Sequence, residues 1–320
     1  MKKFLKILLY IAVNIVLILL IIFLCDICLY SSYLKSKNDF SLKNLIDIYK
    51  IDFIYQNDSK EYFSGGDNLC LKGRAPEGLQ YKKSPILIFG CSFAYGHYLD
   101  NEYTFSHRLA EDLKRPVYNR AFCGAGFQHM YKQSLSENFF SNVPPSDTVI
   151  YVLIGEHFRR MFGETFTIYD NFINTHYNFT ESEFVEDDYN NTLTKLIKKS
   201  PVMKWGRNRI FDYYLKNEKF YENISDEALA YFIKTRENLE NKWKKKVKFI
   251  VFVYAGSKLD AYLIPKLKEN GFIVITMQDL TKEDIFFEKY ISKENLHPTK
   301  EAWDLVTPLF INEMKKEKVL

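Results

Sequence analysis

The chain has 320 residues, which is enough for one large domain with attachments. Its 44 basic and 40 acidic residues leave a net charge of +4, too close to balance to predict a nucleic-acid partner. Its five cysteines have neither the number of a complete disulfide framework nor metal-ligand spacing with the histidines, so we expect no metal and no cofactor.

The N-terminus carries the strongest single signal. Residues 7–24 are almost wholly apolar, and eighteen residues of helix reach about 27 Å, roughly one bilayer core. Three lysines precede this stretch, so the positive-inside rule keeps the N-terminus in the cytoplasm and places the rest outside. We therefore expect residues 1–30 to be an uncleaved single-pass anchor in the cell (inner) membrane. A cleaved signal peptide is the alternative, but its apolar core would be shorter and would end in a small-x-small site.

The region between the anchor and the first apolar strand is polar and mixed. It contains Ser64-Gly65-Gly66-Asp67 and Pro76-Glu77-Gly78, which are both turn signals. We expect residues 31–83 to form a stalk and a short lead-in.

A regular alternation of apolar runs and helical patterns begins at residue 84. Short runs without polar alternation predict strands at residues 86–89, 116–119, 148–154, 249–254 and 272–276. Strands of this kind, separated by helices, predict a doubly wound α/β domain with a parallel sheet over residues 84–315. Residues 158–245 interrupt the alternation for longer than one crossover needs. We expect a functional insertion or lid there, with an amphipathic helix from Asp226 to Trp243.

Two residues that lie far apart in the sequence, Ser92 and His297, suggest nucleophilic chemistry. Ser92 follows the first strand directly, so we expect it at the ligand-binding edge of the sheet. A serine hydroxyl needs a base and a group that orients the base. His297 lies on a loop before the last helix, which Thr299 can cap, and Glu294 three residues earlier can orient the imidazole.

Four motifs fall in one order at predicted strand ends. They are Gly90-Cys91-Ser92 with Gly96, Asn119 with Gly124, Gly155 with His157, and Glu294-x-x-His297. In this order and spacing the chain resembles the SGNH (GDSL-type) hydrolase family over residues 84–157 and 248–315. The resemblance implies a Ser92–His297–Glu294 triad and an oxyanion hole formed by the N–H groups of Ser92 and Gly124 together with His157.

The chain departs from the family's pattern at three positions. Cys91 replaces the aspartate of the first block, Glu294 replaces the aspartate of the last block, and His157 replaces an asparagine that donates to the oxyanion. A neutral imidazole can still donate from one nitrogen. Candidate substrate-binding residues are Arg159 and Arg160, which could bind an anionic group, and Asn119.

These features lead us to expect a membrane-anchored serine esterase or O-acyltransferase outside the cytoplasm. The expected substrates are ester-linked acyl groups, acetyl first, on surface or wall glycans. A catalytically inactive binding or scaffold protein with the same fold is one alternative, favoured by Cys91 and His157. A lipid or thioester hydrolase is another and would need an apolar acyl slot near Ser92. A disulfide between Cys91 and Cys123 stays open.

Overall fold

The computed structural model describes residues 74–161, 175–178, 183–186, 218–282, 289–293 and 295–320, together with positions 14, 17 and 21. The chain divides into two compact units, residues 1–57 with 188–216 and residues 58–187 with 217–320. In the first unit Asn14, Leu17 and Ile21 are helical, and the rest of the expected anchor lies outside the described residues. The described part of the chain contains no helix that is long and apolar enough to cross a membrane.

The second unit is built on a five-stranded parallel sheet. The strand order is β2-β1-β3-β6-β7. The strands β1, β3 and β6 are β-branched and aromatic runs that are buried along most of their length, as a sheet covered on both faces requires, and the edge strand β7 is half-buried. This confirms the predicted parallel α/β fold, and each predicted strand is present within one residue at either end. The bounds are β1 (Ile86–Phe89), β2 (Val117–Asn119), β3 (Thr148–Ile154), β6 (Lys248–Ala255) and β7 (Ile273–Thr276).

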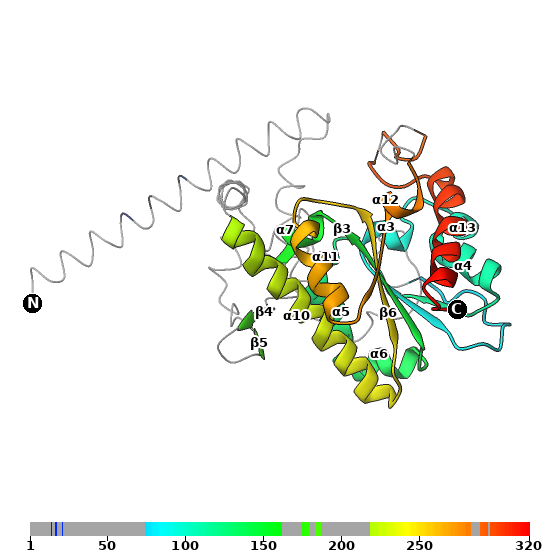
Figure 1. Ribbon diagram of the computed structural model, residues 1–320, viewed down its shortest axis with the longest axis horizontal. Helices are drawn as coiled ribbons and strands as arrows, with labels where there is room; N and C mark the ends of the chain where they lie inside the picture. The colour runs from blue at the N-terminus through cyan, green and yellow to red at the C-terminus, as the bar shows by residue number, and fades with distance from the viewer. Residues whose placement is uncertain are drawn as a thin grey trace, which may run out of the picture. The chain divides into compact units, whose positions relative to one another are not determined.

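Helices cover both faces of the sheet (Figure 1). On one face α4 (Phe105–Leu113) and α13 (Lys300–Lys316) pack over alternate strand residues in a core that includes Trp303. On the other face the ring of Tyr151 stacks on Phe127. The helices on this second face are α5 (Phe127–Gln133), α10 (Glu218–Trp243) and α11 (Asp260–Glu269).

Shorter elements complete the described part. They are α3 (Ser92–Tyr95), η1 (Asn101–Tyr103), α6 (Glu137–Asn142), α7 (Glu156–Met161), α12 (Met277–Leu280) and an antiparallel hairpin of β4 (Thr175–Asn178) and β5 (Glu183–Glu186).

The expected insertion contributes a layer of the fold. Its predicted helix is present as α10, which begins eight residues earlier than predicted, at Glu218. Phe232 of α10 lies edge-on to Tyr151 of β3 and Phe249 of β6, so α10 covers the sheet at these two strands. A helix that buries this much aromatic surface is part of the core and not a lid. The rest of residues 162–217, apart from β4 and β5, lies outside the described residues.

The expected lead-in also joins the sheet. Glu77 pairs with Val117 through two backbone hydrogen bonds of 3.0 Å, and the Arg74 N–H donates to the Asn119 carbonyl at 3.0 Å. The folded domain therefore includes residues before position 84.

The strand order determines where a ligand site can form. The chain moves from β1 outward to β2 and then returns to the other side of β1 for β3, so the winding direction reverses between β1 and β3. Parallel sheets bind ligands in the crevice at the carboxyl ends of the strands at such a reversal. The segments that begin at Gly90 and at Gly155 follow these two strands directly.

Candidate active site

Ser92 lies in a tight strand–turn–helix connection at the end of β1. Gly90 has a φ of +147°, and a Cβ on it would lie 2.7 Å from the Cβ of Ala94, so only glycine fits this turn. Cys91 is fully buried in the core, and Ser92 is the first residue of α3 with 7% of its surface exposed. Cys91 is therefore a core residue at the position where the family has aspartate.

Ser92 and His297 are in direct contact although 205 residues separate them. The Nε2 atom of His297 lies 2.8 Å from the Ser92 hydroxyl oxygen, and its Nδ1 atom lies 2.6 Å from the Asn295 carbonyl oxygen. A carbonyl oxygen only accepts, so Nδ1 must carry the proton and donate. Nε2 is then free to accept the proton of the Ser92 hydroxyl. This is the arrangement that makes serine a nucleophile.

The environment of His297 keeps its imidazole neutral. Burial lowers the pKa of His297 below its usual value, the hydrogen bond to Asn295 opposes this, and the positive charge of Arg160 lowers the pKa further. A neutral imidazole at physiological pH is the form that a general base requires.

The loop before α13 holds His297 in place through its backbone. The His297 carbonyl accepts from Ser292 N–H at 3.0 Å, its N–H donates to the Asn295 side chain at 3.0 Å, and Thr299 caps α13 through Ala302 N–H, as predicted. The predicted orienting carboxylate, Glu294, lies outside the described residues.

Two backbone N–H groups are available for an oxyanion hole. Gly124, with a φ of +77°, lies in the loop between β2 and α5, and Ser92 begins α3. Neither N–H has a hydrogen-bond partner among the described residues. The first N–H groups of a helix are left open by its geometry, and both donors are of the kind that stabilise a tetrahedral oxyanion.

Asn119 has a different place from the one the sequence suggests. It is 1% exposed, its amide donates to the Ala94 carbonyl at 2.7 Å and lies 3.2 Å from the Ser106 hydroxyl, and its oxygen accepts from Ala121 N–H at 3.1 Å. All of its polar atoms are used to join the β2 loop to α3, so Asn119 supports the site and offers nothing to a substrate.

His157 is completely buried beneath the loop that follows β3. Its Nδ1 atom lies 2.9 Å from the Tyr151 hydroxyl, and its Nε2 atom has no partner among the described residues. Fewest polar groups are left unpaired if Tyr151 donates to Nδ1 and Nε2 carries the proton. Burial, followed by the charge of Arg160, lowers the pKa of His157 well below its usual value. His157 is thus a neutral donor whose Nε2–H group is buried and has no partner among the described residues.

The two candidate arginines lie on α7. Arg160 is half-buried, and its Nη1 atom donates to the Ala125 carbonyl at 2.5 Å, beside Gly124. Its charge lowers the pKa of His297 and of His157, so it lies within electrostatic reach of both. Arg159 is half-buried on the same turn. The structure therefore brings Arg160 to the site together with Ser92 and His297.

Sequence reasoning missed two groups at this edge. The rings of His97 and Tyr98 lie with their centroids 5.7 and 5.3 Å from that of His297. The Arg74 guanidinium donates to the carbonyls of Tyr95, Gly96 and Leu99 and fixes the turn after α3. Two aromatic residues directly after Gly96 were the available signal. Nothing in the sequence pattern marks Arg74.

Cys91 and Cys123 do not form the disulfide that the sequence left open. Cys91 is a free, buried thiol, and Cys123 is disulfide-bonded. A bridge between Cys91 and Cys123 is therefore excluded, because Cys91 faces the core between the sheet and α4.

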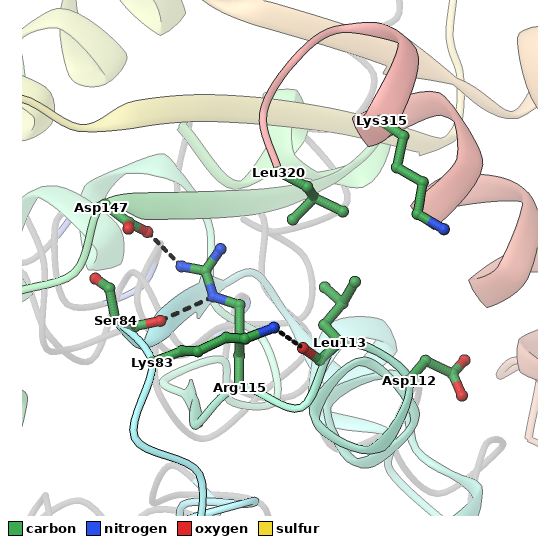
Figure 2. A pocket seen from close by; sticks show the side chains of 8 residues that line it. All are labelled: Lys83, Ser84, Asp112, Leu113, Arg115, Asp147, Lys315 and Leu320. Atoms are coloured by element: carbon green, nitrogen blue, oxygen red, sulfur yellow. Dashed lines mark hydrogen bonds and ion pairs between the residues drawn. The ribbon is translucent and has the colours of Figure 1, made fainter.

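A polar hollow lies at the opposite, amino-terminal edge of the sheet (Figure 2). This cavity of about 540 Å³ is bounded by residues that precede β1, β2 and β3. Arg115 donates there to the carbonyls of Ser84 and Pro85 and pairs with the Asp147 carboxylate. The Lys83 ammonium donates to the Leu113 carbonyl at 3.2 Å.

No protein-family model matches the chain, and no curated protein matches it. Solved structures with a similar fold include two proteins assigned to the lipolytic G-D-S-L family. The one from Desulfitobacterium hafniense DCB-2 is 14% identical, with 71% of this chain and 98% of that chain covered and a TM-score of 0.40. The one from Veillonella parvula DSM 2008 is 11% identical, with 72% and 97% covered and a TM-score of 0.41.

A third similar structure is the lipase Lip_vut3 from a goat rumen metagenome, which is 11% identical, with 72% and 97% covered and a TM-score of 0.40. At TM-scores this low we base the assignment of function on the geometry of the site alone.

Proposed function

We propose that the protein is a serine esterase or O-acyltransferase that acts on ester-linked acyl groups, acetyl first, of glycans outside the cytoplasm. The observation that carries this proposal is the 2.8 Å contact between the Ser92 hydroxyl and His297 Nε2, with Nδ1 bonded to a carbonyl. A serine, a neutral base and an acceptor that sets the tautomer are the parts that acyl transfer through an acyl-enzyme needs.

The first half-reaction forms an acyl-serine. The Ser92 hydroxyl oxygen attacks the ester carbonyl carbon while His297 Nε2 takes its proton. The negative charge that develops on the carbonyl oxygen is stabilised by the open N–H groups of Ser92 and Gly124. When the tetrahedral intermediate collapses, the bond to the alcohol breaks and His297 returns the proton to the leaving oxygen. Asn295 holds the imidazole in one orientation throughout.

The second half-reaction transfers the acyl group from Ser92. Water or a second sugar hydroxyl gives its proton to His297 and attacks the acyl carbon. When the tetrahedral intermediate collapses, the bond to Ser92 breaks and the Ser92 oxygen takes that proton from Nε2. Water makes the protein an esterase, and a sugar hydroxyl makes it an O-acyltransferase. Arg160, beside the Gly124 loop, is the candidate that binds an anionic part of the substrate.

The proposed location rests on two features. Residues 7–24 form an apolar stretch preceded by lysines, which favours a single-pass anchor with the N-terminus in the cytoplasm. The disulfide of Cys123 supports an oxidising compartment for the domain. Membrane lipid is therefore a proposed partner through the anchor, alongside the ester-bearing substrate.

One observation favours a second candidate, a binding protein that has kept the fold. His157 is enclosed by Tyr151 and Phe127, and its open Nε2 is buried. An oxyanion hole that uses His157 requires its Nε2–H to reach the substrate. A buried Nε2 does not reach it, and this favours the binding protein.

Covalent labelling of the full chain in detergent with a fluorophosphonate tests the assignment. We expect label on the Ser92 peptide by mass spectrometry and loss of that label in His297→Ala. Arg115→Met, altered at the opposite edge of the sheet, serves as the matched control and should label normally. A folded wild-type protein that takes no label would contradict the esterase and favour the binding protein.

A further inference from the structure

We propose that Tyr98 and Leu296 form a subsite for the alcohol half of the ester and that this alcohol is a sugar ring of the pyranose type. The inference rests on the proposed function and names the part of the substrate that these two side chains contact.

The two side chains are unusually exposed. Among the described large apolar residues, Leu296 and Tyr98 are the two most exposed, at 69% and 64%. Single exposed apolar residues are common on protein surfaces. These two are distinctive because one directly precedes His297 and the other has its ring 5.3 Å from the His297 ring.

The chemistry determines which half of the substrate they meet. His297 returns a proton to the leaving alcohol, so the alcohol oxygen must lie beside Nε2 in the tetrahedral intermediate. The carbonyl oxygen points instead to the open N–H groups of Ser92 and Gly124. The Tyr98 ring, 5.3 Å from the imidazole, therefore borders the alcohol and not the acyl oxygen, and Leu296 directly precedes His297 in the same loop.

The backbone at both positions supports a functional role. Five described residues other than glycine have positive φ, and three of them, Lys114, Lys244 and Lys318, follow the long helices α4, α10 and α13. A left-handed residue at that place satisfies the last carbonyls of a helix. Tyr98 (φ 69°) and Leu296 (φ 57°) end no long helix. Bulky residues held in this region cluster at sites where the constraint serves binding.

The neighbours of Tyr98 hold its ring in place. The His97 ring packs against it with centroids 3.8 Å apart. Arg74 donates to the carbonyls of Gly96 and Leu99 on either side of the pair, both at 2.8 Å. A side chain fixed in this way loses little freedom when a ligand stacks on it.

The surroundings indicate a ring with hydroxyl groups. Residues 100–102, which follow Tyr98, are exposed Asp, Asn and Glu. The chain that continues from Tyr98 is therefore exposed and carries polar groups, whereas a fatty chain needs a continuous apolar slot. A pyranose offers a flat C–H face for the ring of Tyr98 and hydroxyl groups for the polar border.

Kinetics with paired acetate esters test the subsite in the full chain. The esters are a methyl glycopyranoside carrying one acetyl group and ethyl acetate, which share the acyl group and differ in the alcohol. Tyr98→Asn removes the ring but keeps a residue that tolerates positive φ. We expect kcat/KM for the pyranoside to fall about tenfold, mainly through KM, with ethyl acetate unchanged. Tyr98→Phe should behave like wild type, and Leu296→Asn should show the same selective loss to a smaller degree.

The outcomes separate the subsite from the proposed function. Equal losses on both esters in Tyr98→Asn would mean that Tyr98 acts through His297, which overturns the subsite and leaves the esterase intact. A third ester, ethyl octanoate, tests the acyl side: a larger loss of kcat/KM on it than on the pyranoside in Tyr98→Asn would overturn the subsite in favour of an acyl slot. A wild-type protein that cleaves neither ester and takes no label on Ser92 would overturn both. An unchanged melting temperature shows that the variants are folded.

Discussion

Both edges of the central sheet carry charged and polar side chains, and they differ in whether those groups are paired. At the amino edge, Arg115 bonds to Ser84, Pro85 and Asp147, so the starts of three strands are tied by paired groups. At the carboxyl edge, the groups without a partner among the described residues include the N–H of Gly124 and the buried Nε2 of His157. Arg115 and Asp147 at the amino-edge cavity already bond to each other, whereas the carboxyl edge combines unpaired donors with a serine and a neutral base.

The largest expected effect is a loss of activity on substitution at the carboxyl edge. Ser92→Ala removes the nucleophile, and we expect kcat on an acetate ester to fall about 10⁴-fold with the melting transition unchanged. Steady-state kinetics and thermal unfolding measure the two quantities. Turnover that survives in Ser92→Ala would refute the role of this residue.

The next prediction concerns the amino edge. Arg115→Met leaves the Ser84 and Pro85 carbonyls without this donor, while the Asp147 carboxylate keeps the Thr148 hydroxyl, and we expect the free energy of unfolding to fall by about 1–3 kcal/mol. The kcat of the folded fraction should stay at the wild-type value. Chemical denaturation gives the first number. A selective loss of turnover would mean that the cavity of Figure 2 communicates with the site.

A buried carboxyl at the carboxyl edge should have the opposite effect on stability. Asp260 accepts from Ser257 N–H, its Oδ1 is buried without a partner, and burial raises the pKa of Asp260 from 3.8 to about 6. A raised pKa stabilises the folded state below about pH 4, and this contribution is lost as the pH rises through about 6. Asp260→Asn should therefore stabilise the protein by about 1–2 kcal/mol at pH 7.5 and by little at pH 4. Equal changes in the free energy of unfolding at pH 7.5 and pH 4 would show that Asp260 is not a buried charged carboxylate at pH 7.5.

A smaller effect is expected at Glu294. His297 Nδ1 already donates to the Asn295 carbonyl. We therefore expect Glu294→Gln to lower kcat less than about tenfold, far less than His297→Ala does. A loss equal to that of His297→Ala would assign the orienting role to the carboxylate after all.

The smallest effect is a shift in pH dependence. The charge of Arg160 lowers the pKa of His297, so Arg160→Gln should raise that pKa and move the acid limb of kcat/KM to higher pH. Arg160→Lys keeps the charge and should leave the limb in place. An acid limb that does not move in Arg160→Gln would show that the charge of Arg160 does not set the pKa of His297.

Much of the sheet could be predicted from the sequence because its strands are continuous apolar runs. Thr148–Ile154 agrees residue for residue with the predicted run, since a strand buried on both faces has no polar position to confuse it. The helices α5 and α6 were not predicted. Their burial is set by contacts such as Phe127 on Tyr151 and Phe139 on Phe89, which depend on tertiary packing.

The candidate site was predictable where a residue lies directly next to the end of a predicted strand or helix. Ser92 and His297 follow from the positions of a strand and a capped helix, and the structure brings them together. The role of the Asn295 carbonyl was not predictable, because every residue has a carbonyl and only the loop geometry selects one. The burial of Asn119 was equally hidden, since the Ala94 carbonyl and the Ser106 hydroxyl reach it only after α3 and α4 have packed.

The backbone acceptor at His297 has a genetic consequence. Any codon change at position 295 leaves a peptide carbonyl there, so no single missense mutation at that position deletes the group that orients the base. A carboxylate in the same place could be lost to one nucleotide change and could be protonated in an acidic medium. The Asn295 carbonyl has neither weakness, so a mutation at position 295 acts only through the side-chain bond to the His297 N–H, and inactivating mutations should accumulate at Ser92 and at His297 itself.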